Sequence, residues 1–321
     1  MTATTDAVAA DAAAATSEET RRGTVGLVYG LAAFVTWGLL PLYFHALRTV
    51  PALETLAHRI VWATVMLIVL LTLRGSWREG FAAIAARSSL GVWRNLRVFG
   101  VTTVLLSTNW LVYITAVNTD RVLEASLGYF VTPLVNVVLG IVVLGERLSR
   151  PQGVAIAIAT GGVLVLMVGT ASAPWIPLTL ALSFGTYGLL RKRLVVPPIM
   201  ALLVETIVML PIAGGYLVFL AARGESMLGG GDATVDALLL GTGIITALPL
   251  IWFGHAARRL RLSTLGALQY LSPTMGMVIA IGVFAESFGH WHAVAFGAIW
   301  VSLAIYGVDA ARRSRALVQS R

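Results

Sequence analysis

Three ionisable side chains near the start of one apolar stretch could bind a polar or charged substrate. Glu54 and His58 are one helical turn apart on the same face of a helix, and Arg59 is rotated by about 100° from His58. Because a charge inside the hydrocarbon region of a membrane is costly, each residue is a candidate functional group. Arg59 would anchor an anionic or carbonyl-bearing substrate. The alternative is an interfacial cluster in which Arg59 snorkels to the surface or pairs with Glu54.

Another ionisable residue, Glu205, lies about seven residues into a later apolar stretch and has no basic neighbour at helical spacing. Water stabilises an ionised carboxylate, so a buried carboxyl group favours its neutral form and can exchange a proton during transport. Glu205 and Glu54 are therefore the candidates for proton coupling. The alternative for Glu205 is a structural carboxyl group, either protonated or paired with a residue distant in sequence.

Each proline inside an apolar stretch leaves one backbone carbonyl, four residues earlier, without its helical hydrogen bond, because proline has no N–H to donate. Pro133 and Pro273 release the carbonyls of Tyr129 and Gln269. Released carbonyls are costly in lipid, so they should face protein or a wet cavity. Together with nearby aromatic and amide side chains they predict the wall of a substrate cavity, and a packing kink is the alternative. The predicted substrate-binding residues are Trp37, Arg59, Asn109, Trp110, Tyr113, Tyr129, Asn136, Gln269 and Tyr270.

The prolines also predict where the helices bend. Each lies within an apolar stretch, where its ring and its missing N–H interrupt the helical hydrogen bonds. Such kinks would permit rocking or local bending without unfolding. The predicted kinks lie at Pro41, Pro133, Pro211, Pro249 and Pro273.

Two of these prolines belong to similar segments of the chain. Pro133 is followed thirteen residues later by Glu146, and Pro273 is followed at the same spacing by Glu286. An uncharged apolar segment separates each proline from its glutamate, which indicates an internal duplication. The glutamates are interpreted as residues that mark helix ends and bond to loop amides, and gate carboxylates are the alternative.

A second match supports the duplication, because Phe34 to Leu40 resembles Phe184 to Leu190 and the two matches occur in the same order in both halves. Internal repeats are a known mark of secondary transporters. The apolar stretches that carry these residues are therefore interpreted as two related sets, one in each half of the chain.

The composition of the chain is that of a membrane protein. Hydrophobic residues make up 58% of the 321 residues and charged residues 12%, against about 25% charge in ordinary soluble domains. The net charge of +8 does not indicate nucleic-acid binding, because Lys and Arg lie between apolar runs rather than on one face. The chain has no cysteine, which excludes disulfides, thiolate catalysis and cysteine-ligated zinc.

Ten stretches are long enough to cross a hydrocarbon core of about 30 Å. The predicted spans are Thr24 to Leu47, Ala52 to Leu73, Leu96 to Val117, Val122 to Leu144, Gly153 to Thr170, Trp175 to Leu190, Ile199 to Ala221, Ala237 to His255, Leu262 to Phe288 and His292 to Val308. With the N-terminus inside, 19 of the 23 Lys and Arg residues are cytoplasmic. Five spans in each half then require the second half to be inverted relative to the first.

The predicted fold is an all-α integral membrane protein with ten transmembrane helices, built as two inverted five-helix repeats. Both termini are expected to be cytoplasmic. The predicted parts are a disordered cytoplasmic tail (1–22), the first five-helix repeat (23–170), the second five-helix repeat (171–310) and a basic cytoplasmic tail (311–321).

Several sequence blocks between about residues 24 and 310 carry a family resemblance. They are Ala33 to Tyr43, Pro51 to Trp62, Asn109-Trp110 with Tyr113, Glu124 to Pro133, Gly145 to Ser149 and Leu262 to Pro273. In this order they resemble the RarD family of EamA-type transporters, within the drug/metabolite transporter superfamily. The resemblance implies a ten-helix carrier of the bacterial inner membrane with a central cavity shared by the halves. It leaves the substrate unsettled, and Ala285 departs from the pattern where the first half has Gly145.

The favoured function is a secondary transporter that moves a small organic metabolite or drug-like compound across the inner membrane by alternating access, with export favoured over import. An intramembrane enzyme would need paired acids, a metal cluster or a nucleophile with a base, and no such set occurs at workable spacing. No metal or cofactor is predicted, and no Walker-type loop indicates ATP. A channel would need charged rings or carbonyl filters. A membrane sensor or scaffold stays open, as do proton coupling and the choice between monomer and homodimer.

Overall fold

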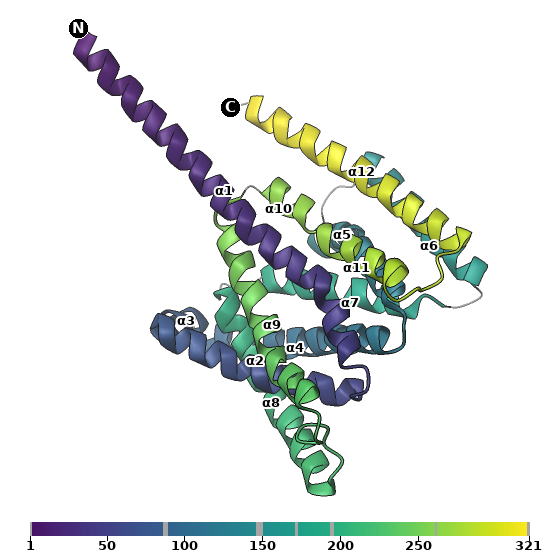
Figure 1. The fold of residues 1–321 in the computed structure, drawn as a ribbon. Coiled ribbons are helices and arrows are strands. Elements are labelled where there is room, and N and C mark those ends of the chain that lie inside the picture. The colour runs from purple at the N-terminus through teal and green to yellow at the C-terminus, as the bar shows by residue number, and fades with distance from the viewer. Residues whose placement is uncertain are drawn as a thin grey trace.

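The computed structural model describes residues 2–85, 89–145, 150–170, 173–192, 196–260 and 262–319, and these residues form helices and loops without a strand. The helices are α1 (Thr2–Ala46), α2 (Ala52–Arg74), α3 (Trp77–Ala85), α4 (Ser89–Asn118), α5 (Val122–Leu144), α6 (Arg150–Thr170), α7 (Trp175–Lys192), α8 (Pro198–Arg223), α9 (Ala233–Ala257), α10 (Leu262–Leu268), α11 (Leu271–Gly282) and α12 (His290–Gln319). The chain thus forms a helical bundle, and both of its ends lie on the same side of it (Figure 1).

The membrane-spanning segments agree closely with the sequence prediction. Nine segments of the described chain are long and apolar enough to cross a membrane. The predicted sixth span corresponds to α7, which is not among the nine because Arg191 and Lys192 end its 18 residues and lower its mean hydropathy. Helix α5 begins and ends where the sequence predicted. The all-α membrane fold is confirmed.

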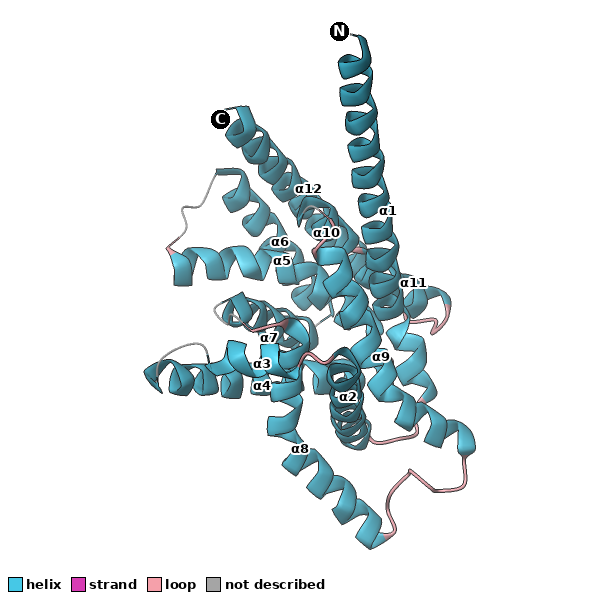
Figure 2. Cartoon of the chain, turned by 90° about the vertical axis from the view of Figure 1, so that its left-hand side faces the viewer, coloured by secondary structure: helices cyan, strands magenta, loops and turns pink. Residues whose placement is uncertain are grey.

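The predicted N-terminal tail differs from the structure. Residues 2–22, expected to be disordered, continue the helix of the first span, so that α1 contains 45 residues. The segment is rich in alanine, which has the highest intrinsic helix propensity. At about 1.5 Å per residue, α1 is roughly twice as long as a hydrocarbon core is thick. Figure 2 shows its N-terminal part projecting away from the bundle.

The predicted ninth span is also different, because it is divided into α10 and α11. The chain leaves the helix at Gln269 and Tyr270, and α11 resumes at Leu271 and ends at Gly282 instead of continuing to Phe288. Pro273 lies in the first turn of α11, where its missing N–H removes no intrahelical hydrogen bond. Pro273 therefore does not kink a continuous helix. The other four predicted kink residues lie inside helices, namely Pro41, Pro133, Pro211 and Pro249.

Contacts between helices follow a regular pattern. Helix α1 packs against α9 and α11, and α7 packs against α4 and α5. The first five long helices are α1, α2, α4, α5 and α6, and the last five are α7, α8, α9, α11 and α12. If each helix of the first set is exchanged in order with its counterpart in the second, these contacts of α1 become these contacts of α7. The pairs α2–α8, α5–α11 and α6–α12 convert into themselves, and α6 and α12 run side by side at one flank (Figure 1). This pattern is what a pseudo-two-fold axis requires, and the inversion of the repeats stays a prediction.

Apolar side chains occupy both the interior and the outer faces of the bundle. Phe44 and Phe130 are among the fully buried residues of the main core cluster. Outward-facing residues such as Val142, Ile212 and Val218 are instead more than two-thirds exposed. Such surfaces are unfavourable in water and suit contact with lipid.

The start of α5 is fixed by Glu286, which lies in the segment between α11 and α12. Its Oε1 accepts a hydrogen bond from the Val122 N–H at 2.6 Å, and its Oε2 accepts one from the Leu123 N–H at 2.9 Å. A carboxylate at this position satisfies free amides and complements the helix dipole. Burial raises the pKa of Glu286, and the two amide hydrogen bonds oppose that shift. The predicted bonding to amides is confirmed here, at a helix start rather than a loop, whereas Glu146 lies outside the described residues.

Candidate substrate site

Arg59 lies in the interior of the bundle on the face of α2 that meets α4 and α9. Its side chain is buried, and its Nε donates a hydrogen bond to Thr246 Oγ1 at 3.1 Å. The guanidinium carbon is 4.0 Å from the centre of the Trp110 ring and 5.4 Å from that of Phe44. Within the described part of the chain, no carboxylate comes within ion-pair distance of Arg59. The cation is held by aromatic faces and a hydroxyl group, and its charge is not neutralised by these groups.

The structure does not contain the interfacial cluster that was the alternative for Arg59. Glu54 does not pair with Arg59, because its Oε1 accepts a hydrogen bond from the Met227 N–H at 2.8 Å, in the loop between α8 and α9. Glu54 and His58 are both buried, and Glu54 Oε1 is 3.9 Å from His58 Nε2. Glu54 thus ties α2 to a loop that is distant in sequence.

Three of the predicted aromatic and amide residues surround Arg59 and Trp110. Asn109 is buried, and its Nδ2 donates hydrogen bonds to the Leu180 carbonyl at 3.2 Å and to Ser183 Oγ at 3.0 Å. Its Oδ1 accepts a hydrogen bond from Tyr129 Oη at 3.1 Å, and the Tyr129 and Tyr113 rings are 5.9 Å apart. These bonds connect α4, α5 and α7. The structure therefore brings Arg59, Asn109, Trp110, Tyr113 and Tyr129 together.

The remaining predicted substrate residues lie elsewhere. Trp37 packs against Phe253 of α9, with ring centres 5.7 Å apart, and Tyr270 stacks on Phe130 at 6.3 Å. Gln269 and Asn136 are exposed. Their roles in substrate binding stay predictions, and the group around Arg59 is the compact part of the predicted site.

Glu205 is fully buried in α8 and has two partners on α7. Tyr187 Oη donates a hydrogen bond to Glu205 Oε2 at 3.1 Å, and Arg191 Nη1 is 3.9 Å from Glu205 Oε1. The sequence did not reveal these partners, because they lie on a different helix and no helical spacing connects them. In the sequence, Arg191 contributes to the charge bias and Tyr187 lies within the repeated segment Phe184 to Leu190, and neither pattern connects them to Glu205.

Arg59 and Glu205 occupy corresponding positions in the two halves. Pro51 precedes α2 with φ −53° and ψ 136°, and Pro197 precedes α8 with φ −53° and ψ 139°. Arg59 comes eight residues after Pro51, and Glu205 comes eight residues after Pro197. Helices α2 and α8 cross in contact with each other, and α2 carries a buried cation while α8 carries a buried acid.

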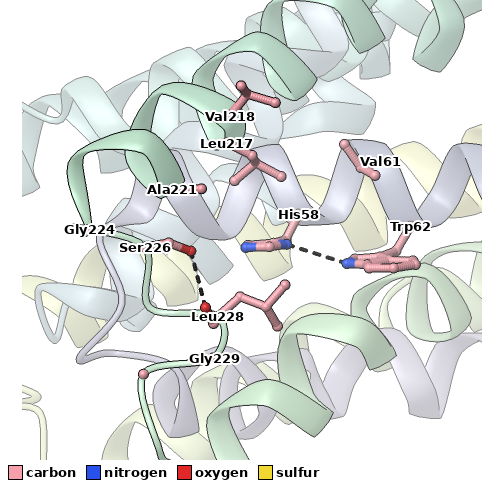
Figure 3. A pocket seen from close by; sticks show the side chains of 11 residues that line it. His58, Val61, Trp62, Leu217, Val218, Ala221, Gly224, Ser226, Leu228 and Gly229 are labelled. Atoms are coloured by element: carbon pink, nitrogen blue, oxygen red, sulfur yellow. Dashed lines mark hydrogen bonds between the residues drawn. The ribbon is translucent and has the colours of Figure 1, made fainter.

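A pocket of about 550 Å³ lies beside this crossing, between α2, α8 and the loop that follows α8. Figure 3 shows His58 and Trp62 of α2 on one wall and Leu217, Val218 and Ala221 of α8 on another. The volume is in the range of ordinary ligand sites. Sequence reasoning missed this pocket, because the loop that closes it carries no distinctive motif. Over the described residues, no group of three His, Cys, Asp or Glu side chains could hold a metal ion.

Comparisons with known proteins connect this arrangement to transporters. The pattern of the EamA-like transporter family matches residues 24–168. A Vibrio cholerae protein described as an uncharacterized transporter is 42% identical over 90% of this chain and 96% of its own length. The protein RarD of Escherichia coli is 40% identical over 92% of this chain and 96% of its own length. The chloramphenicol-sensitive protein RarD of Pseudomonas aeruginosa is 32% identical, with 90% and 96% coverage.

A solved crystal structure has the same fold. It superposes with a TM-score of 0.55 at 18% sequence identity, and the match covers 88% of this chain and 97% of that chain. At this identity the likeness concerns the fold alone.

Proposed function

The chain belongs to the RarD family of EamA-like transporters, and on that premise we propose that it is a secondary carrier for a small organic metabolite or drug-like compound. It works by alternating access in the bacterial inner membrane, with both termini in the cytoplasm and with export as the favoured direction. The family is one of membrane transporters, and the further details are our proposal.

The observation that carries the proposal is the buried Arg59 without a counter-charge among the described residues. Burying an unpaired charge is costly, so such a residue is retained where a ligand neutralises it. Trp110 offers a ring face beside the guanidinium group, and the amide and hydroxyl groups of Asn109 and Tyr129 lie nearby. This set suits a partly apolar substrate that carries a carboxylate or carbonyl group.

Alternating access is supported by the contact pattern of the helices. The contacts of α1 with α9 and α11 have counterparts in the contacts of α7 with α4 and α5, which supports two related halves that exchange conformations during transport. Arg59 of α2 contacts Trp110 of α4 and Thr246 of α9, so it lies between helices of the two halves. A site at that position can be exposed to either side in turn.

The experiment begins with cells that express the protein, the Arg59→Gln variant or an empty vector, whose internal and external metabolites are compared. We expect one or a few anionic or carbonyl-bearing metabolites to accumulate outside only with the unaltered protein. Labelled forms of these metabolites are then tested for saturable counterflow in proteoliposomes. Saturation and exchange distinguish a carrier from a channel.

Arg59→Lys is the matched variant, because it keeps the charge and loses the planar donor set of the guanidinium group. We expect Arg59→Gln to abolish counterflow and Arg59→Lys to reduce it by about tenfold or more, the usual range for a lost charge-assisted hydrogen bond. The proposal fails if no metabolite differs between the cell lines and none of the tested solutes shows counterflow. That result would favour a sensor or scaffold.

A further inference from the structure

The face of α2 beside Arg59 carries a second arrangement of polar groups. His58 is 2% exposed and lines the pocket between α2, α8 and the loop that follows α8, and Arg59 does not line it. In Figure 3 the His58 ring lies between Trp62 and Ser226, with one nitrogen toward each. Two faces of α2, about 100° apart, thus present different chemistry.

The hydrogen bond to Trp62 fixes the roles of the two His58 nitrogens. Trp62 Nε1 lies 3.3 Å from His58 Nδ1, and an indole N–H can only donate. Nδ1 therefore accepts, and the ring of a neutral His58 carries its proton on Nε2. His58 Nε2 has no hydrogen-bond partner in the described part of the chain, and Glu54 Oε1 at 3.9 Å is beyond hydrogen-bond distance. A buried donor without an acceptor costs free energy that a ligand can recover.

The surroundings of His58 Nε2 limit the ligand to one chemical class. An ammonium head group has no acceptor to offer to an N–H donor. An anionic head group would approach the Glu54 carboxyl group, which is 3.9 Å from the same nitrogen. Most of the other lining side chains are apolar, among them Val61, Leu217 and Val218, and the hydroxyl group of Ser226 already donates to the Leu228 carbonyl.

We infer that this pocket of about 550 Å³ is a second ligand site, separate from the Arg59 group, for an uncharged amphiphile. Its carbonyl or hydroxyl oxygen accepts the hydrogen bond of His58 Nε2, and its apolar body lies along α8. Val218 is 69% exposed on the outer face of α8, so the apolar wall continues to the surface that meets lipid. The inference does not rest on the proposed transport function, because ligand binding is measured without transport.

The test uses two probes of the same shape that differ in one oxygen atom. The ketone para-fluoroheptanophenone offers a carbonyl acceptor, and para-fluoroheptylbenzene lacks it. Fluorine NMR titrations on the full chain in lipid nanodiscs measure the dissociation constant of each probe. We expect the ketone to bind about three- to tenfold more tightly, as one recovered hydrogen bond implies. Equal affinities for the two probes would overturn the inference.

Three variants locate the binding. His58→Phe keeps a planar ring without the donor, and the preference for the ketone should disappear. His58→Gln places an amide donor in a similar position, and the preference should remain. Ala221→Trp fills the pocket from α8, and the specific binding of both probes should be lost. The signal change that remains in this variant measures the partition of the probes into lipid. A ketone preference that survives His58→Phe would contradict the site.

The same titration distinguishes two sources of the natural ligand. The acceptor could be the ester carbonyl of a bilayer lipid or the oxygen of a free amphiphile. If lipid esters occupy the pocket, the ketone binds more weakly in ester-lipid nanodiscs than in ether-lipid nanodiscs, which contain no such carbonyl. Equal affinity in both lipids assigns the pocket to a free amphiphile. Both outcomes support the site and differ only in its occupant.

Discussion

At the level of single residues, Arg59 combines deep burial with the lack of a carboxylate partner in the described part of the chain. Its contacts with Trp110 and Thr246 recover part of the cost of removing the charge from water. They do not neutralise the charge. Arg59 should therefore reduce the stability of the empty protein while it provides affinity for the substrate.

Replacing Arg59 with methionine tests this conflict between stability and function. We expect Arg59→Met to raise the free energy of unfolding by about 1 kcal/mol or more, because it removes an unpaired buried charge and keeps the volume. The midpoint of thermal unfolding, followed by tryptophan fluorescence, should rise while counterflow is lost. Arg48→Met, at an exposed position, is the control and should change stability by less than about 0.5 kcal/mol. A lower midpoint for Arg59→Met would contradict the interpretation.

Glu205 has a separate expected role at this scale. We expect Glu205→Gln to abolish uptake driven by a pH gradient while counterflow of the same solute continues, because the amide cannot exchange a proton and keeps the shape of the carboxyl group. Uptake into proteoliposomes with and without an imposed gradient measures this. Glu225→Gln, at an exposed glutamate, is the control. Unchanged coupling in Glu205→Gln would remove this residue from the mechanism.

The sequence revealed the costly residues of the site more readily than their partners. Arg59, Asn109 and Trp110 were recognisable because polar and aromatic groups are unusual within apolar stretches. Thr246 and Arg191 could not be assigned, since their contacts depend on how α9 and α7 cross α2 and α8. Helical spacing reports neighbours on one helix only, and it carries no information about these crossings.

At the level of elements, Gly128 allows α5 to approach the backbone of α7 closely. A Cβ atom at Gly128 would lie 2.9 Å from the Cα and the carbonyl oxygen of Pro177. Backbone atoms cannot move aside as a flexible side chain can. Tyr129 is the next residue in α5, and its hydroxyl group donates a hydrogen bond to Asn109 of the candidate site. The close contact of α5 with α7 at Gly128 therefore also positions Tyr129.

We expect Gly128→Ala to destabilise the protein by about 1–3 kcal/mol and to weaken substrate binding, because the helices must separate. Gly100→Ala is the matched control in α4, where an added Cβ meets open space. It should be neutral or stabilise the protein by up to about 1 kcal/mol, through the higher helix propensity of alanine. Thermal unfolding of both variants measures the difference. Equal effects of the two changes would contradict the close contact.

The limits of sequence reasoning about elements are clearest around Pro273. Its apolar surroundings predicted a single long span with a kink, whereas the chain forms α10 and α11 with Gln269 and Tyr270 between them. Proline fits the first turn of a helix as well as it kinks an interior, and periodicity does not separate these outcomes. The span of α5, in contrast, has clear turn signals at both ends and was predicted to the residue.

For the whole molecule, the predicted inversion of the two halves leads to a direct test. Glu79 follows the C-terminal end of α2, and Glu225 follows the C-terminal end of α8. If α2 and α8 belong to inverted repeats, these two positions lie on opposite sides of the membrane. The chain has no native cysteine, so each position can be labelled alone.

We expect a membrane-impermeant maleimide to label Glu225→Cys in intact cells and Glu79→Cys only after permeabilisation. This result follows from the charge bias, which places the N-terminus in the cytoplasm. Labelling of the denatured protein is the control for the reactivity of each thiol. Labelling of both positions from the same side would contradict the inverted repeat.

In the proposed carrier, the buried cation at Arg59 would also connect transport to the membrane voltage. An inside-negative potential stabilises the empty, positively charged site when it faces the cytoplasm, by up to about 2.3 kcal/mol per 100 mV. An anionic substrate cancels this charge, so the loaded carrier reorients without opposing the field. Each complete cycle then moves one negative charge outward, and the voltage alone can drive export. Efflux from proteoliposomes should increase with a valinomycin-imposed, inside-negative potential, and an efflux independent of voltage would exclude this form of drive.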